Sequence, residues 1–286
     1  MAEHQLVMGA VAYAPKVVTI WEGFKSWFAQ HDLAFDFVLY SNYERQVEDQ
    51  FNGTLDLAWN SPLAWLRAER MAKAKGLSVS AVAMRDTDCD LTSVLVVRND
   101  SAVQQLEQLR GKTVGFGAID SPQATLIPMD HLRQLGLVAG TDYTARRFDV
   151  LGGKHGDHVG GELDAARALV EGKIDAAWMI DGNHLAFSSD GTLPAGQTRV
   201  LTRTAPFDHC NFTVSPQAPQ QAIARFTELL LGMRWDDPVV RPLLELEGLR
   251  QWKAGRTSGY AALERAIDDE KFYDANGNII ASGYQY

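Results

Sequence analysis

Residues 106–128, LEQLRGKTVGFGAIDSPQATLIP, decide the fold class of this chain. The first five residues predict a short helix, and Lys112–Gly117 predicts a buried strand that ends in glycine. The turn Asp120-Ser121-Pro122 follows. Because proline suits the first turn of a helix, we expect a helix from Pro122 to Leu135. A strand that passes directly into a helix is the repeating element of α/β proteins.

The same alternation extends in both directions along the chain. Apolar residues at helical spacing follow the first strand, at Trp21, Phe24, Trp27, Phe28 and His31. Further helices are predicted at Tyr43–Asn52, from Pro62, and at Leu163–Val170, Ile223–Met233 and Tyr260–Ala266. Strands are predicted at Leu6–Val11, Ala34–Tyr40, Leu55–Trp59, Val79–Met84, Thr92–Arg98, Tyr143–Asp149, Ile174–Ile180, Arg199–Thr204 and Asn211–Val214.

Composition limits the class of protein. A chain of 286 residues, 46% of them hydrophobic, is long enough for two domains with their own cores. The net charge of −9 argues against a nucleic-acid partner, since phosphate backbones are bound mainly by lysine and arginine. A small anionic ligand remains compatible with this charge, because backbone dipoles and a few side chains build such sites.

The sequence also bears on the compartment. No stretch approaches the roughly 20 apolar residues of a membrane span, and MAEHQLVMGAVAY at residues 1–13 lacks the basic and apolar segments of a signal peptide. We therefore expect a cytoplasmic monomer. The alternative is a periplasmic or otherwise extracytoplasmic location after removal of an export signal.

Five segments, in this order, resemble elements of the phosphate/phosphonate solute-binding protein family of ABC transporters. They cover nearly the whole chain. They are LDLAWNSPLAWL (55–66), TSVLVVRNDS (92–101), residues 106–128, ALVEGKIDAAWMID (168–181), and WDDPVVRPLLELEGLRQW (235–252) with GYAALERA (259–266).

The resemblance implies an α/β, two-lobed type 2 periplasmic-binding-protein fold. Residues 1–95 and 205–286 would form lobe I, and residues 96–204 lobe II, with hinge crossovers near Thr92–Arg98 and Arg203–Asn211. The implied function is a solute-binding protein for ABC-type uptake or sensing. Its lobes would close on a small polar, anionic molecule related to phosphonate, phosphate, sulfonate or carboxylate. An ABC transporter permease is the implied partner, and no cofactor or metal is expected.

The candidate ligand-binding residues follow from the rule that ligands of open α/β sheets bind beyond the carboxyl ends of strands. Hydroxyl and amide groups next to helix starts also have a second interpretation as helix caps. Pro122, Gln123 and Ala124 interrupt the Ser/Thr-rich run of the family's phosphonate binders, so a ligand with a carbonyl or amide-matching group beside an oxyanion fits equally well. The candidates are Tyr13, Asn60 and Ser61 in lobe I, and Ser121, Gln123, Thr125 and Asp181 in lobe II.

The stretch GGKHGDHVGGE, Gly152–Glu162, is the most unusual segment. Five glycines allow the backbone to approach a ligand or to form an anion-binding nest. We expect His155 or His158 to contact the solute. The alternatives are a metal pair with Asp157 as the orienting carboxylate, which lacks further ligands nearby, and a solvent-facing loop.

An enzyme is the alternative class, because some proteins of this fold use a cysteine nucleophile. Cys210 lies near the second crossover, and His155 or His158 would be its base. Adjacent strand residues face opposite ways, so we expect His209 to point away from Cys210. Packing as a small buried hydrophobe is the favoured role of Cys210. The spacing of Cys89 and Cys210 indicates no metal site and leaves a single bridge undecided.

Overall fold

The structure, a computed structural model, describes residues 5–286 and divides them between two compact units. Unit 1 comprises residues up to Cys89, Asp208–Tyr260 and Tyr273–Ile279; unit 2 comprises Asp90–Phe207, Ala261–Phe272 and Ile280–Tyr286. The predicted lobes instead placed all of residues 205–286 in lobe I. The difference arises because the helix α9 (Ala261–Asp269) packs on α4 (Ile127–Gln134) within unit 2, with Arg265 paired to Asp130 at 3.0 Å.

Unit 1 is built on a six-stranded sheet in the order β11-β4-β10-β3-β1-β2. The strand β1 runs parallel to β2 and β3, whereas β10 is antiparallel to β3 and β4. Parallel neighbours require helical crossovers, which the chain supplies between β1, β2 and β3. The strands are β1 (Leu6–Val11), β2 (Phe35–Tyr40), β3 (Leu57–Asn60), β4 (Ser80–Arg85), β10 (Asn211–Val214) and β11 (Trp252–Ala254).

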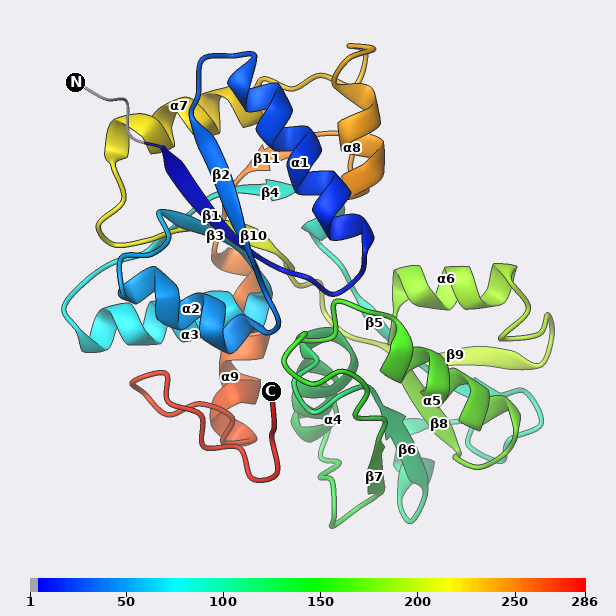
Figure 1. The fold of residues 1–286 in the computed structure, drawn as a ribbon. Helices are drawn as coiled ribbons and strands as arrows, with labels where there is room; N and C mark the ends of the chain where they lie inside the picture. Colours follow the sequence, from blue (N-terminus) through cyan, green and yellow to red (C-terminus); the bar gives the residue numbers. More distant parts are fainter. Residues whose placement is uncertain (1–4) are drawn as a thin grey trace. The chain divides into compact units, whose positions relative to one another are not determined.

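Helices cover both faces of this sheet (Figure 1). On one face, Trp21, Phe24 and Phe28 of α1 follow one another at helical spacing and pack with Phe212 and Phe226 in an extensive apolar cluster. On the other face, α2 and α3 pack on β1 and β3. The helices of unit 1 are α1 (Lys16–Ala29), α2 (Tyr43–Phe51), α3 (Pro62–Ala74), α7 (Gln220–Leu231) and α8 (Arg241–Glu247).

Unit 2 has a five-stranded sheet in the order β7-β6-β8-β5-β9. Alternate residues of β5 face opposite clusters, with Leu95 and Val97 on one side and Val94 and Val96 on the other. Its remaining helical elements include η3, a π-helical turn, and α5. The elements are β5 (Ser93–Arg98), β6 (Thr113–Phe116), β7 (Thr144–Arg147), β8 (Ala176–Ile180), β9 (Thr198–Arg203), η3 (Pro122–Leu126), α5 (Gly160–Val170) and α6 (Asp181–Ser189).

The helix α6 and the strand β11 are among the elements that were not predicted from the apolar pattern. Only Phe187 of α6 is classed as buried, so the helix lacks the repeated apolar positions that indicate a helix face. The strand β11 is three residues long and buries Trp252 alone, which is too short for an alternating pattern. His31 also differs from prediction, because α1 ends at Ala29 and the imidazole stacks on Trp27 beyond the helix end.

The buried Arg67 side chain of α3 supplies a first test of the packing of unit 1. It donates hydrogen bonds to the carbonyl oxygens of Glu44 (2.8 Å) and Gly277 (3.0 Å) and to the Glu48 carboxylate (3.1 Å). Arg67→Met should lower the free energy of unfolding by about 2–4 kcal/mol, because two buried acceptors lose their donor. Urea denaturation measures the loss. The exposed Arg45→Met of α2 is the control, and equal effects of both changes would contradict this role.

Candidate functional site

Three parallel strands of unit 1 end at the same edge of the sheet. The strands β1, β2 and β3 end at Val11, Tyr40 and Asn60, and each is followed within a few residues by the start of a helix. Because the positive ends of helix dipoles lie at helix N-termini, the starts of α1, α2 and α3 bring three such ends to this edge. This is the edge at which open α/β sheets bind ligands.

The start of α1 differs from the other two helix starts. Asn42 caps α2 by accepting from Arg45 N, and Ser61 caps α3 by accepting from Ala64 N. Within residues 5–286, no side chain caps α1, whose first turn contains Lys16 and no acidic residue. Lys16 is exposed and Tyr13 is half-buried in the loop before the helix. This loop therefore combines a cation, a phenol and an uncapped helix start.

Asn60 and Ser61 make hydrogen bonds to other residues of unit 1. Both are fully buried, and the Asn60 amide donates to Gln50 Oε1 (2.9 Å) and accepts from Gln46 Nε2 (2.8 Å). Ser61 Oγ accepts from Ala64 N at 3.1 Å as the cap of α3. These contacts fix the turn between β3 and α3. Solute contacts by either residue stay a prediction.

In unit 2, the predicted residues around Pro122 make similar internal contacts. Ser121 Oγ accepts from Ala124 N, and Thr125 Oγ1 donates to the Ala118 carbonyl oxygen at 2.7 Å. Gln123 Nε2 donates to the Gly156 carbonyl oxygen at 2.6 Å. None of the three predicted side chains exceeds 3% exposure. The glycine-rich segment therefore lies directly on the helix start that carries these candidate ligand-binding residues.

The glycine-rich segment forms an anion-binding turn around a carboxylate of the same unit. Gly153, His155 and Gly156 all have positive φ, which turns successive backbone N–H groups toward one side. Gly153 N and His155 N donate to Asp120 Oδ2 at 2.6 and 3.2 Å. The nest expected from the sequence is present, and a carboxylate of the protein lies within it.

The two histidines of this segment differ in burial. His155 is fully buried, whereas His158 is half-buried and its Nδ1 accepts from Gly160 N at 3.1 Å. Among the described residues, the group of side chains close enough to hold a metal includes neither histidine. Asp181 lies at the end of β8 and accepts from the Thr92 hydroxyl at 2.8 Å, with Arg203 at 3.5 Å.

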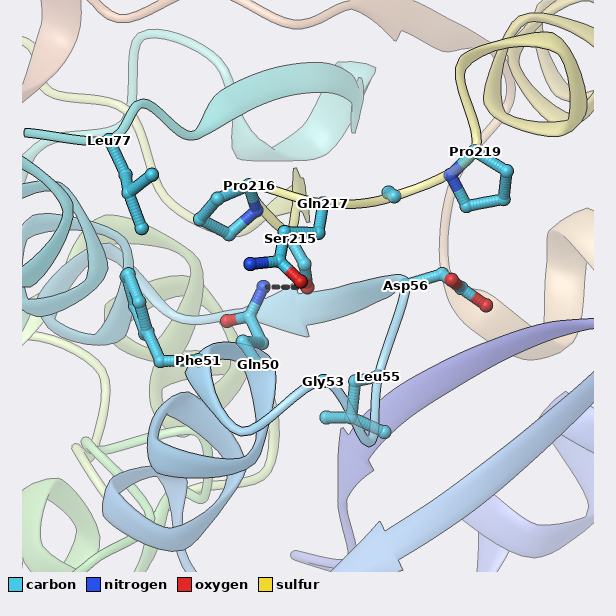
Figure 2. Close-up of a pocket in the computed structure, with 11 residues that line it drawn as sticks. Gln50, Phe51, Gly53, Leu55, Asp56, Leu77, Ser215, Pro216, Gln217 and Pro219 are labelled. Atoms are coloured by element: carbon cyan, nitrogen blue, oxygen red, sulfur yellow. Dashed lines mark hydrogen bonds between the residues drawn. The ribbon is translucent and has the colours of Figure 1, made fainter.

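A pocket of about 340 Å³ in unit 1 lies at the opposite end of the sheet (Figure 2). It opens where β3 begins and β10 ends, since Leu57 pairs with Val214 there and Asn60 pairs with Asn211 at the other end. Figure 2 shows Gln50 and Ser215 on its wall, joined by a long hydrogen bond of 3.4 Å. No predicted site residue lines this pocket, which comprises Gln50, Phe51, Gly53, Leu55, Asp56, Leu77 and residues 215–219.

Comparison with known proteins identifies the family. Residues 10–260 match the family model described as "ABC transporter, phosphonate, periplasmic substrate-binding protein". The chain belongs to this family. Solute binding is accordingly its function, as the resemblance predicted.

Solved structures confirm the fold of this substrate-binding protein. PhnD1 from Prochlorococcus marinus in complex with methylphosphonate is 16% identical, with a TM-score of 0.67 over 92% of this chain and 97% of that one. A Xanthomonas citri protein bound to ATP is 16% identical, with a TM-score of 0.71 over 93% and 99%. The Escherichia coli aliphatic sulphonate binding protein SsuA is 16% identical, with a TM-score of 0.59 over 94% and 91%. The predicted two-lobed type 2 periplasmic-binding-protein fold is therefore confirmed.

The second crossover of this substrate-binding protein corrects one prediction. His209 does not point away from Cys210, because its Nδ1 lies 3.1 Å from Cys210 Sγ. The reason is that β10 begins at Asn211, so the alternation of an extended strand does not apply to the two preceding residues. Cys210 is buried in the apolar cluster of unit 1, and within residues 5–286 neither cysteine forms a disulfide.

Sequence analysis missed a charged cluster beside this crossover. Arg85, at the end of β4, contacts Asp88 through Nε (2.5 Å) and Nη2 (2.9 Å), and Glu247 Oε1 through Nη1 (3.2 Å). Burial alone would raise the pKa of Asp88, but Arg85 and His209 outweigh it and lower the pKa to about 2. The run MRDTDCD directly after a predicted strand was the available signal. The pairing of Arg85 with Glu247 has no sequence signal, because 162 residues separate the two partners.

A substitution at Gly156 tests whether the glycine-rich segment of this substrate-binding protein must lie against the helix start. A Cβ at Gly156 would lie 2.7 Å from Gln123 Nε2 and 2.8 Å from Ser121 Cβ, at φ +72°. Gly156→Ala should therefore lower the free energy of unfolding by about 2–4 kcal/mol, through backbone strain and overpacking together. Gly136 has a similar φ of +78°, with no described atom within 4 Å of its Cβ position.

Gly136→Ala is the matched control, because it carries the strain without the clash and should cost about 1 kcal/mol. Urea denaturation of both variants provides the measurement. An equal loss of unfolding free energy in both variants would show that Gly156 is needed only for its backbone angle. The segment could then move away from the helix without loss of stability.

Proposed function

We propose that this substrate-binding protein binds a small oxyanion of the phosphonate or sulfonate class, with the oxyanion held at the start of α1. The observation that carries the proposal is the uncapped start of this 14-residue helix, with Lys16 in its first turn. An anion there is stabilised by the helix dipole and by a nearby cation. The half-buried Tyr13 adds a hydroxyl donor in the same loop.

A comparison of free energies shows that several groups must contribute to solute binding. A micromolar solute needs about 8 kcal/mol of binding free energy. A helix terminus supplies roughly 0.3–1 kcal/mol when exposed and up to ~2 kcal/mol when partly buried. A hydrogen bond to a charged group adds about 1.5–3 kcal/mol. The start of α1, Lys16 and Tyr13 therefore need further donors, and unit 2 is the source that the sequence predicts.

The contacts predicted in unit 2 stay part of the proposal. Ser121, Gln123 and Thr125 are engaged with their own backbone and with the glycine-rich segment. Contact between these groups and a solute requires residues 150–159 to move away from the helix start. His155, His158 and Asp181 are the remaining proposed contacts in this region.

The solute class is supported by the relatives. One neighbouring structure holds methylphosphonate, and another is of an aliphatic sulphonate binding protein. Both solutes place a tetrahedral oxyanion on an organic group. The net charge of −9 does not oppose such binding, since the site depends on local groups. The organic group would set specificity among these solutes.

The family implies an ABC transporter as partner. We propose that the protein delivers its solute to the permease as a monomer, in the extracytoplasmic location that is usual for the family. The cytoplasmic location expected from the sequence receives no support from the family. Among residues 5–286, no helix has the length and apolar character needed to cross a membrane.

The enzyme alternative is not favoured. The family to which the chain belongs binds solutes. Within unit 1, Cys210 has His209 beside its sulfur. Its burial at 2% exposure also keeps a substrate away from the sulfur.

Lys16 provides the direct test of the oxyanion site. Lys16→Ala should weaken binding of methylphosphonate by roughly five- to thirtyfold, because a cation and its hydrogen bond to a charged group are lost. Isothermal titration with methylphosphonate, inorganic phosphate and ethanesulfonate measures the effect. Lys75→Ala is the control, since Lys75 is also exposed but lies at the far end of α3.

Two outcomes would contradict the proposal. Unchanged affinity in Lys16→Ala would show that the oxyanion is not held at α1. Equal losses in Lys16→Ala and Lys75→Ala would show a general effect of protein charge. A selective loss that is shared by phosphonate and sulfonate would support the class assigned here.

Solute-driven closure is a separate prediction from the sequence. If the crossovers act as hinges, saturation with a binding solute should reduce the radius of gyration. Small-angle scattering with and without the best-binding solute of the titration series measures the change. An unchanged radius at saturation would argue against closure while leaving the oxyanion site intact.

A further inference from the structure

One group of side chains in unit 1 converges without a role in solute binding. Among residues 5–286, Asp88, His209 and Cys210 form the group in which three possible metal-ligating atoms lie within 4.8 Å of one another. His209 Nδ1 lies 3.1 Å from Cys210 Sγ and 3.5 Å from Asp88 Oδ1. All three residues are buried, with exposures of 1–7%.

The backbone brings these residues together. Asp88 ends the short 3-10 helix η1 (Asp86–Asp88) after β4, whereas His209 and Cys210 directly precede β10. His209 N donates to the Asp88 carbonyl oxygen at 2.8 Å, which fixes the two segments side by side. The Tyr260 hydroxyl donates to the His209 carbonyl oxygen at 2.8 Å and holds it from the other side. Backbone hydrogen bonds therefore hold the two segments that carry the three side chains.

The geometry does not match a cysteine–histidine–aspartate catalytic triad. In such a triad, one ring nitrogen faces the nucleophile and the other faces the carboxylate. Here the same nitrogen, His209 Nδ1, is near both the sulfur and the carboxylate oxygen. Three possible ligand atoms of different elements within 4.8 Å of one another instead resemble the arrangement of a metal site.

We propose that Asp88, His209 and Cys210 bind a divalent cation of the Zn²⁺ type. Tetrahedral zinc with ordinary bond lengths requires about 3.4 Å between nitrogen and oxygen ligands and about 3.6 Å between nitrogen and sulfur. The Nδ1–Oδ1 distance of 3.5 Å already fits, and the Nδ1–Sγ distance of 3.1 Å has to open by about half an ångström. The fourth coordination position is left to water or a small anion.

Charge balance favours a divalent cation here. Arg85 and Arg256 carry two positive charges, and their partners Asp88, Glu247 and Asp208 carry three negative charges. Binding releases the Cys210 proton and converts the thiol to a thiolate, which brings the cluster to a net charge of −2. A divalent cation neutralises it. His209 then coordinates through the Nδ1 lone pair and carries its proton on Nε2.

Arg85 acts on the site through Asp88. It holds the carboxylate by two hydrogen bonds, yet each carboxylate oxygen keeps a second lone pair for a metal. Metal-ligating carboxylates are commonly held in this way by a neighbouring donor. Arg85 is therefore a positioning residue, and Glu247 in turn fixes Arg85 from α8. The inference goes beyond the proposed oxyanion site and does not depend on it.

Cobalt titration of the full chain tests the cation site. After treatment with a chelator, Co²⁺ should bind one equivalent and produce the near-ultraviolet charge-transfer band of a cobalt–thiolate bond. Zn²⁺ should displace the cobalt and abolish the band. In competition with a chromogenic chelator, Cys210→Ser and His209→Gln should each weaken Zn²⁺ binding at least tenfold. Cys89→Ser is the matched control, because Cys89 Sγ contacts the Arg85 carbonyl oxygen and is not one of the converging atoms.

Each outcome decides the proposal. It is supported if the band and tight Zn²⁺ binding are kept in Cys89→Ser and lost in Cys210→Ser and His209→Gln. It is overturned if the parent chain gives no band, if the band survives Cys210→Ser, or if Cys89→Ser alone abolishes it. If Cys210→Ser does not fold, His209→Gln and Cys89→Ser decide by the same criteria, together with a Zn²⁺-dependent rise in melting temperature expected only in Cys89→Ser and the parent.

Discussion

Buried polar groups at the strand ends must find partners within their own unit, and this constraint decides which residues remain for binding. Helices cover both faces of the unit 1 sheet, so water cannot satisfy the groups beneath them. The Asn60 amide is therefore held between Gln46 and Gln50, and the Asn211 amide donates to Tyr260 Oη. Asn60 and Asn211 therefore stabilise unit 1 itself, although their positions at strand ends are those expected of ligand-binding residues.

The loop after β1 is exposed, so its polar groups do not need partners within the protein. Ala12, Pro15 and Lys16 are exposed, and α1 begins without a capping side chain among the described residues. A helix start that lacks a capping side chain keeps the attraction of its dipole for an anion. The corresponding start in unit 2 is capped by Ser121 and covered by the glycine-rich segment. Two helix starts that look alike in the sequence therefore differ in what they offer to a solute.

The strength of the apolar pattern determined how much of the fold could be predicted. Trp21, Phe24 and Phe28 repeat at helical spacing and predicted α1, and the run Leu6–Val11 predicted β1 to the residue. The helix α6 buries Phe187 alone and gave no such signal. Residue types also identified the candidate site segments correctly as turns and helix starts. Whether a hydroxyl such as that of Thr125 faces a solute or the Ala118 carbonyl depends on three-dimensional packing, which local sequence does not contain.

The cluster at the second crossover shows the same limit for charged residues. Alternation predicted that His209 would face away from Cys210, but the strand begins one residue after Cys210, and the two side chains meet. Arg85 could be placed at a strand end from the sequence, whereas its partner Glu247 comes from α8. A buried guanidinium between two carboxylates leaves one negative charge uncompensated, and a deprotonated Cys210 would add another. Because low dielectric makes such an imbalance costly, the proposed divalent cation would lower the electrostatic cost of burying this cluster.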